Sequence, residues 1–300
     1  MHRFASWQLF AICVLVWGTT WYAITFQVAG LSPEFGVALR FAIAGLTVLL
    51  ACVLRGERLQ VPAAGHARLA LQGSFMFGVS YLCVYHAERH IVSGLVAVGY
   101  SASPLVTGLG AHWLFGQRVT ARFLLGGVIG LAGIVLIFWP EFTVAAHDAG
   151  TTTGAAFIAA AVALSSVGSL AASRNRLHGL AFWPALGLSM LYGAVTCGLV
   201  AVLLGREFVL PATPAWWISL VYLALAGSVL TFASFLTLQE RIGPGPTSAI
   251  GVMTPLVALA VSMVFEGYRP AWLTFGGVLL AVAGNVLMLR RRVRQRQGCT

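Results

Sequence analysis

The sequence predicts an all-α integral membrane protein, with ten transmembrane helices arranged as two inverted five-helix repeats and both termini in the cytoplasm. Three observations lead to this fold class. The composition is strongly apolar, apolar runs of about 20 residues recur about every 30 residues, and glycine, proline and arginine residues match at one internal offset.

The composition excludes a soluble domain. Of 300 residues, 59% are hydrophobic and 9% are charged, and the mean hydropathy is +0.89. A soluble domain carries about 25% charged residues. A chain with this much apolar side chain is expected to be solvated by lipid.

Ten apolar runs are long enough to cross a bilayer core of roughly 30 Å as helices that rise about 1.5 Å per residue. They lack the alternation of membrane β-strands, and lipid leaves unpaired backbone groups unsatisfied, so we expect helices. The first run is too long for the apolar part of a cleavable signal peptide, and we expect it to stay as a helix. The expected spans are residues 7–28, 33–54, 69–90, 92–115, 123–140, 153–173, 180–204, 215–238, 245–265 and 271–289.

The arginines predict the orientation, because short cytoplasmic loops carry an excess of basic residues. The chain has 18 arginines and no lysine. With the N-terminus inside, the opposite side carries only Arg89, Arg206 and Arg269, while Arg40 lies within a span. The cytoplasmic side then carries Arg3, Arg55, Arg58, Arg68, Arg118, Arg122, Arg174, Arg176, Arg241 and the five arginines of the tail RRRVRQR.

The net charge of +10 is explained by these loops and by anionic lipid headgroups, so we predict a lipid bilayer and not a nucleic acid as partner. The cysteines also carry no recognisable site. Cys13, Cys52, Cys83 and Cys197 lie within spans, Cys299 lies in the tail, and no CxxC spacing occurs. We expect no disulfide framework, no metal and no cofactor.

An internal repeat predicts two domains, residues 1–145 with five spans and residues 146–300 with five spans and the basic tail. A shift of 151 residues lays Pro104 on Pro255. It also lays Gly94 on Gly245, Leu105 on Leu256, Gly116 on Gly267, Arg118 on Arg269, Gly126 on Gly277 and Gly133 on Gly284. Because five is odd, the second half enters the membrane from the opposite side. Inverted repeats of this kind are typical of secondary transporters, whose site lies near the midplane between the halves.

At this point the chain resembles a known family, the EamA-type drug/metabolite transporters, and within it the YddG-type aromatic amino acid exporters. The resembling segments are VWGTTWYAI in span one, ALRFAIAGL in span two and, in each half, a proline followed by Gly-x-Arg and a glycine-patterned helix. The resemblance covers nearly the whole chain and implies the EamA fold and export. The family often has glutamate in the Gly-x-Arg turn, where this chain has Gln117 and Tyr268.

Pro104 and Pro255 lie about half-way along spans four and nine. Each removes an amide and frees the carbonyl four residues earlier, on Tyr100 and on Gly251. A water-filled cavity or a substrate ammonium group can satisfy a freed carbonyl, so we predict gating helix breaks at Pro104, Pro255 and Gly251. The alternative is a structural kink that a neighbouring helix satisfies.

Five aromatic residues lie deep within spans and are predicted to face inward and bind substrate: Trp17, Trp21, Tyr81, Tyr85 and Tyr100. A tyrosine hydroxyl in hydrocarbon needs a partner. Ordinary helix packing is the alternative for each. The tryptophans at span ends are predicted to form an interfacial belt with no other role: Trp7, Trp139, Trp216, Trp217 and Trp272.

Polar residues near the spans leave further alternatives. Ser248 shares a face with Gly251 and Pro255 and is a candidate for substrate binding, with close helix packing as the alternative. Arg40 could pair with a substrate carboxylate, but the favoured interpretation is snorkelling or an ion pair with Glu34, six residues earlier.

The stretch SYLCVYHAERH places His86 and His90 four residues apart with Glu88 between them. The spacing is not HExxH, so a metal site is not favoured, and Glu88 instead shares a face with the two tyrosines of the stretch. The glycine rows are expected to be close-packed seams, either within the monomer or at a dimer contact: Gly126, Gly130 and Gly133 with Gly277 and Gly284.

These features favour an exporter of aromatic and other neutral amino acids that works by alternating access in the bacterial inner membrane, as a monomer or weak homodimer. The midplane lacks the carboxylate or histidine chain usual in proton-driven carriers, which favours a facilitator without obligate proton coupling. Export of drugs or other small hydrophobic metabolites is the alternative in the same class. No GxSxG, HExxH or acidic pair occurs, so we predict that the chain is not an enzyme, and a membrane-embedded enzyme is the weakest alternative.

Overall fold

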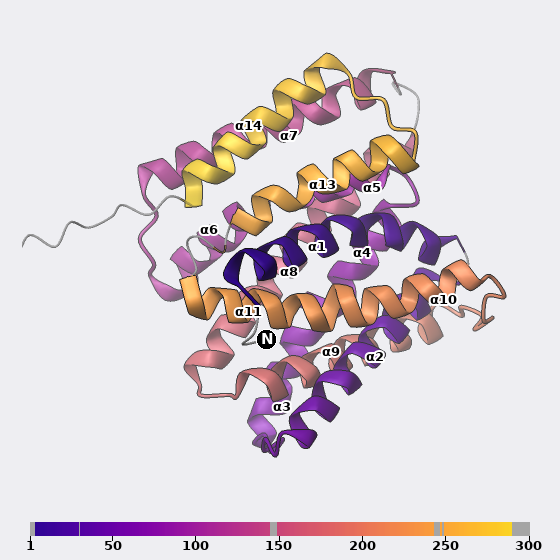
Figure 1. Ribbon diagram of the computed structural model, residues 1–300, viewed down its shortest axis with the longest axis vertical. Coiled ribbons are helices and arrows are strands. Elements are labelled where there is room, and N and C mark those ends of the chain that lie inside the picture. The colour runs from indigo at the N-terminus through magenta and orange to yellow at the C-terminus, as the bar shows by residue number, and fades with distance from the viewer. Residues whose placement is uncertain (1–3, 30, 145–148, 243–246, 248, 290–300) are drawn as a thin grey trace, which may run out of the picture.

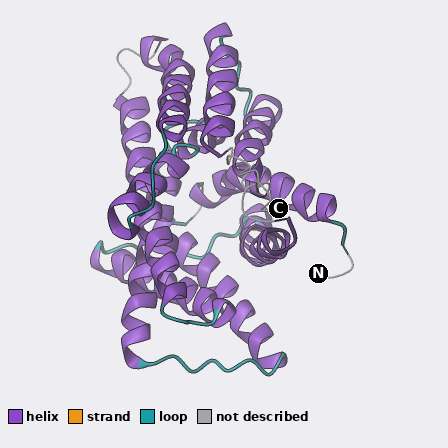
Figure 2. Cartoon of the chain, turned by 90° about the vertical axis from the view of Figure 1, so that its left-hand side faces the viewer, coloured by secondary structure: helices purple, strands orange, loops and turns teal. Residues whose placement is uncertain are grey.

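The computed structural model describes residues 4–29, 31–144, 149–242, 247 and 249–289, and this part of the chain is helical throughout, with short loops between the helices (Figure 2). The first half contains α1 Ser6–Val28, α2 Pro33–Leu54, α3 Ala63–Gly73, η1 Ser74–Val79, α4 Ser80–Ala87, α5 Ser93–Tyr100, α6 Ser103–Phe115 and α7 Ala121–Val144. The second contains α8 Ala149–Leu177, α9 Phe182–Leu203, α10 Pro214–Val221, η2 Tyr222–Leu230, α11 Thr231–Ile242, α13 Ala249–Phe265 and α14 Trp272–Leu289.

Eight helical segments of the described chain are long and apolar enough to cross a membrane, and two shorter apolar helices, Ala249–Phe265 and Trp272–Met288, follow them. The chain is therefore a multi-pass membrane protein. The ten predicted spans each coincide with one of these segments, but only eight meet the criterion of length and composition. The predicted domain boundary at residues 145 and 146 and the basic tail lie outside the described residues.

Two spans contain a π-helical segment in the middle. In α3–η1–α4 it is η1, and in α10–η2–α11 it is η2. A shift of 151 residues moves η1 inside η2, and the same distance separates the starts of α3 and α10 and the starts of α7 and α14. Because π-helical turns are rare and concentrate at functional sites, their occurrence at matching places supports the proposal of an internal repeat.

The helices at the edges of the bundle pair across the two halves of the chain. Figure 1 shows α7 beside α14 at one edge and α2 beside α9 toward the opposite edge. Between these pairs, α1 packs on α13 and α11, while α8 packs on α3, η1, α4 and α6. The interior is thus built mainly from contacts between elements of different halves.

Glycines make the α7–α14 pair possible. A Cβ on Gly126 would lie 2.6 Å from the carbonyl oxygen of Gly284, and one on Gly277 would lie 2.6 Å from that of Gly133. Such distances leave no room for a side chain, so the two backbones touch directly. The predicted glycine seam therefore lies within the monomer, and the alternative of a dimer contact is not needed to explain it.

The two matched prolines have different effects. The fourth span is interrupted at Ser101 and Ala102, and Pro104 occupies the first turn of α6, where a proline is tolerated. Ser101 and Ser103 donate from their hydroxyls to the carbonyls of Val98 and Tyr100, at 2.6 and 2.7 Å, and so compete with helical bonds.

By contrast, α13 continues through Pro255. The residue that matches Ser103 in the second half is Thr254, whose hydroxyl donates to the carbonyl of Ile250 four residues earlier, at 2.8 Å. That bond is compatible with a helix. The predicted break is therefore found at Pro104, but Pro255 and Gly251 lie in an unbroken helix.

Candidate functional site

The largest cavity lies at the end of the bundle where α2 and α8 end and α9 begins, which we call the Arg176 end. Its volume is about 930 Å³, and it is bounded by the last turns of α2, the start of α9, η2 and α11. Arg55, Arg176, Trp183 and Thr237 are among its lining residues, and the rest of its wall is mostly apolar. An apolar cavity with a few polar groups at its mouth is typical of a small-molecule site.

A second cavity of about 250 Å³ adjoins the first and extends between α3, η1, α8 and α11. The two share Arg176, Phe182 and Leu236 as lining residues. Ser169 and Ser173 of α8 supply hydroxyl groups to the second cavity. Together the two cavities form a path from the Arg176 end toward the centre of the bundle.

The predicted aromatic residues lie next to this path. Trp17 donates from Nε1 to the carbonyl of Gly227 in η2, at 3.1 Å, and packs on Phe232 and Phe235 with ring centroids 5.6 and 5.5 Å away. Both phenylalanines line the second cavity. Trp17 is thus one ring behind the cavity wall, and its bond fixes it to the π-helical segment.

The other predicted aromatics also face the protein interior. Trp21 packs on Tyr100, with ring centroids 5.6 Å apart, and Tyr81 packs on Phe41 at 4.7 Å. Tyr85 is fully buried. The residues that line the two larger cavities are a different set, so direct substrate contact by the predicted five stays a prediction.

A small third cavity of about 20 Å³ is lined by Gly251, Pro255 and Ser101, among others. The structure therefore brings the interruption of the fourth span next to the proline of α13. Ser248, predicted beside them, lies outside the described residues.

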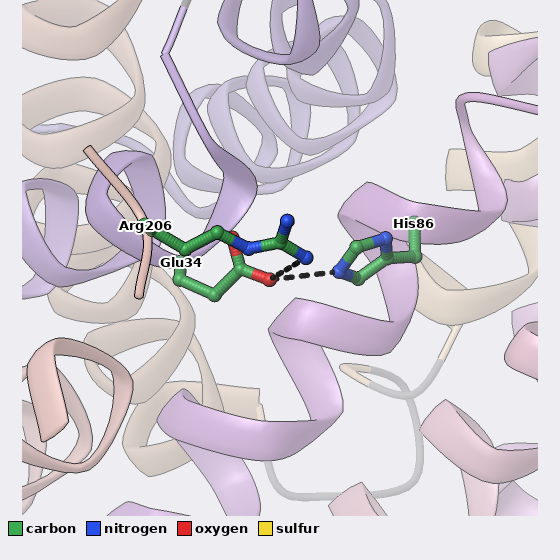
Figure 3. A network of polar contacts seen from close by, with 3 residues as sticks. All are labelled: Glu34, His86 and Arg206. Atoms are coloured by element: carbon green, nitrogen blue, oxygen red, sulfur yellow. Dashed lines mark hydrogen bonds and ion pairs between the residues drawn. The ribbon is translucent and has the colours of Figure 1, made fainter. Parts of the chain in front are cut away.

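Polar contacts close the other end of the bundle, where α2 begins and α4 and α13 end, which we call the Glu34 end. His86 donates from Nε2 to Oε1 of Glu34 at 3.2 Å, and Nη2 of Arg206 lies 3.5 Å from the same oxygen. Figure 3 shows both nitrogens converging on this oxygen from opposite directions. The three residues join α2, α4 and the loop after α9.

A second contact set at the same end ties α5 to α13. The carboxylate of Glu266 accepts bonds from the backbone N–H of Ser93 at 3.2 Å and from its hydroxyl at 2.6 Å. Ser262 donates to the same carboxylate. A carboxylate at the first residue of a helix satisfies free N–H groups and complements the helix dipole.

Three sequence expectations at this end are corrected. Trp216 is not an interfacial belt residue, because it is 1% exposed. Gln27 donates to its carbonyl at 2.8 Å and accepts from its Nε1 at 3.2 Å, which holds the indole inside the bundle. The other four belt tryptophans, Trp7, Trp139, Trp217 and Trp272, are exposed as predicted.

Arg40 neither snorkels nor pairs with Glu34. It is 2% exposed, and its guanidinium lies over the rings of Phe41 and Tyr81, 5.2 and 4.8 Å from their centroids. Glu34 is occupied by His86 and Arg206 instead. The six-residue spacing placed Arg40 and Glu34 on different faces of α2, where helix geometry does not bring their side chains together.

The sequence analysis missed Glu34 as a closing residue, although one signal was available. Arg206 is one of three arginines on the side that the positive-inside rule leaves poor in arginine. A charge placed against that bias needs a partner. Among the described residues, no group of three or more His, Cys, Asp or Glu side chains could hold a metal ion, and His86 and His90 both stack on Phe157.

Comparisons with known proteins identify the family. The sequence profile of the EamA-like transporter family matches residues 5–139 and 153–290. The chain belongs to this family. The match to transporters points away from catalysis and agrees with the resemblance noted in the sequence.

Several curated EamA relatives are named as transporters. The uncharacterized inner membrane transporter YedA of Escherichia coli (strain K12) is 27% identical over 91% of this chain and 88% of its own. A probable terminal-alkyne amino-acid exporter of Streptantibioticus cattleyicolor is 26% identical over 98% of this chain and 96% of its own. Protein PecM of Dickeya dadantii is 26% identical over 88% and 84%.

One solved crystal structure has the same fold. It superposes with a TM-score of 0.69 at 20% identity and covers 96% of this chain and 99% of the other. This EamA-like chain is therefore a multi-pass membrane transporter of the drug/metabolite class, with a cavity at one end of the bundle and polar contacts across the other.

Proposed function

We propose that the protein exports aromatic and other neutral amino acids across the bacterial inner membrane by alternating access. The observation that carries the proposal is the cavity of about 930 Å³ at the Arg176 end together with the polar closure of the Glu34 end. A path that is open at one end and closed at the other is what one state of an alternating-access transporter requires.

The orientation gives this state a direction. The arginine distribution places the Arg176 end in the cytoplasm. The cavity then takes substrate from the cytoplasm, as an exporter must. In this scheme the two halves of the chain are inverted repeats, and the outward state forms when the contacts at Glu34 and Glu266 separate.

The cavity suits an amino acid with a large apolar side chain. Its volume lies within the usual range for ligand pockets, about 300–1,000 Å³. Burial of an aromatic ring of about 150–250 Å² at about 25 cal/mol per Å² yields roughly 4–6 kcal/mol before the costs of immobilisation. A net of about 4 kcal/mol corresponds to millimolar binding, which suits the export of an abundant metabolite. The amino-acid exporter of Streptantibioticus cattleyicolor supports this substrate class at 26% identity.

Reconstituted transport tests the proposal. The purified protein in proteoliposomes should exchange labelled phenylalanine and tryptophan. Leu236→Trp, at the junction of the two cavities, should reduce the flux by at least about tenfold because a larger side chain fills the path. Leu204→Trp, at an exposed position just after α9, is the matched control. The absence of amino-acid flux in the wild type would refute the proposal.

The second candidate is export of drugs or other small hydrophobic metabolites, which the apolar wall of the same cavity favours. Competition separates the two. Hydrophobic drugs that inhibit phenylalanine exchange and are themselves carried would support the broader substrate range. A facilitator without proton coupling should exchange amino acids at the same rate with and without a pH gradient.

A further inference from the structure

Arg40 is a buried charge without a matched partner. It lies six residues after Glu34 in α2, about 9 Å further along the helix axis, and is 2% exposed. Its Nε and Nη1 make no hydrogen bond to any described residue. The rings of Phe41 and Tyr81 cover the guanidinium but cannot accept the in-plane N–H bonds that a carboxylate accepts. A guanidinium held flat against rings keeps these in-plane donors available.

Glu88 is the complementary case. It follows the last residue of α4, is 8% exposed, and neither of its carboxylate oxygens has a hydrogen-bond partner among the described residues. It interacts electrostatically with Arg40 and with Glu266. No ion pair joins it to Arg40, although each is the natural counter-ion of the other. The two opposite charges are therefore near each other but separated.

Tyr85 lies between them in the chain of contacts. Its fully buried hydroxyl interacts electrostatically with both Arg40 and Glu88 and has no hydrogen-bond partner of good geometry within the described chain. A cationic donor, a hydroxyl and an anionic acceptor thus occur together, and all three have unused hydrogen-bonding capacity. Natural proteins rarely leave buried polar atoms unsatisfied, and such groups indicate an unfilled role.

The group is separated from the transport path by aromatic rings. Phe232, in the wall of the second cavity, packs on Phe77 with ring centroids 6.1 Å apart. Phe77 packs on Phe41 at 5.2 Å, and Phe41 lies under Arg40. Movement of these rings would connect the cavity with the charged group. A substrate that reached it would be enclosed by aromatic side chains.

We propose that Arg40 and Glu88 form an occluded zwitterion site, in which the guanidinium binds the carboxylate of an amino-acid substrate and the Glu88 carboxylate binds its ammonium group. Tyr85 donates a further bond to the bound carboxylate, and the rings of Tyr81 and Phe41 contact the apolar side chain. The inference rests on the proposed export of amino acids and extends it by assigning the two charged contacts.

Other substrates fit this group of residues less well. A phosphorylated compound would need several cations, and Arg40 faces an acidic residue instead. An organic cation would satisfy Glu88 but leave Arg40 without an acceptor. A neutral hydrophobic compound would leave both charges unsatisfied. Only a molecule with one anionic and one cationic group satisfies both at once.

The test compares phenylalanine with two analogues, phenethylamine, which lacks the carboxylate, and 3-phenylpropionate, which lacks the ammonium group. In wild-type proteoliposomes neither analogue should compete with labelled phenylalanine at concentrations at which unlabelled phenylalanine does. Arg40→Gln should raise the half-saturating concentration of phenylalanine by at least about tenfold, the usual effect of losing a charged hydrogen bond, and leave phenethylamine transport unchanged. Glu88→Gln should spare 3-phenylpropionate in the same way.

The ratio of phenylalanine to analogue transport is measured within each preparation, so it does not depend on the fraction of folded protein. Arg40→Lys keeps the charge but not the planar fork and should give an intermediate ratio. Arg58→Gln, at an exposed arginine in the loop after α2, is the matched control and should leave the ratio unchanged.

The outcomes separate the two proposals. Phenylalanine flux with ratios that are the same in wild type, Arg40→Gln and Glu88→Gln overturns the zwitterion site and leaves amino-acid export intact. Strong competition by either analogue in the wild type also overturns the site. A wild type that carries drugs but no amino acid overturns both.

Discussion

The α7–α14 seam gives the sharpest stability prediction, because two adjacent glycines of α14 lie in opposite surroundings. A Cβ on Gly277 would lie 2.6 Å from the backbone oxygen of Gly133 and from Cγ1 of Ile137, which is fully buried. A Cβ on Gly276 would have no atom within 4 Å. The substitutions Gly277→Ala and Gly276→Ala therefore differ only in what the added methyl group meets.

The size of the effect follows from these distances. Carbon atoms pack at about 3.5–4.0 Å, so the two helices must separate by roughly 1 Å to admit the methyl group at residue 277. Overpacking of this kind costs about 1–3 kcal/mol. Both substitutions gain the same helix propensity, about 1 kcal/mol, which cancels when the variants are compared. We expect Gly276→Ala to be slightly more stable than wild type and Gly277→Ala to be about 1–3 kcal/mol less stable than Gly276→Ala.

Thermal unfolding of the two purified variants in the same detergent measures this difference. For a chain of this size, about 1–3 kcal/mol corresponds to a difference in Tm of roughly 2–10 °C. Equal Tm values for the two variants would show that the α7 and α14 backbones do not touch at this position, and the close-packed seam would have to be abandoned.

Two further predictions concern the closed end of the bundle. His86→Phe keeps a ring that can stack on Phe157 but removes a donor to buried Glu34, so we expect about 1–3 kcal/mol lower stability. Adding Glu34→Gln should restore most of this loss in thermal unfolding, and additive losses would argue against the pairing. Glu266→Ala removes the acceptor for the N–H and hydroxyl of Ser93 and should also cost about 1–3 kcal/mol. Glu266→Gln keeps an oxygen acceptor and should lose less, and equal losses would contradict the bond to Ser93.

The positions of the helices follow closely from the sequence. The apolar run 33–54 coincides with α2 Pro33–Leu54, and the run 271–289 with α14 Trp272–Leu289. This works because lipid imposes one requirement on every span, a long apolar helix with all backbone groups bonded within it. The requirement is local, so a local pattern is sufficient to predict it.

The interruptions of the helices were only partly predictable. Proline marked both Pro104 and Pro255, but one span is broken and the other is not. The difference depends on the neighbouring side chains, since serine hydroxyls compete with the helix near Pro104 and Thr254 bonds along it near Pro255. The π-helical segments η1 and η2 have no comparable signal in the sequence.

The sequence by itself determined that the chain crosses a membrane many times, where each helix lies and which aromatic residues face inward. Only the tertiary structure decided which charges meet, pairing Glu34 with His86 and Arg206 and leaving Arg40 buried over Tyr81. The physical reason is one of range. Apolar periodicity records how a helix meets lipid, whereas a contact between two helices depends on their relative depth and rotation, which residues far apart in the chain fix together.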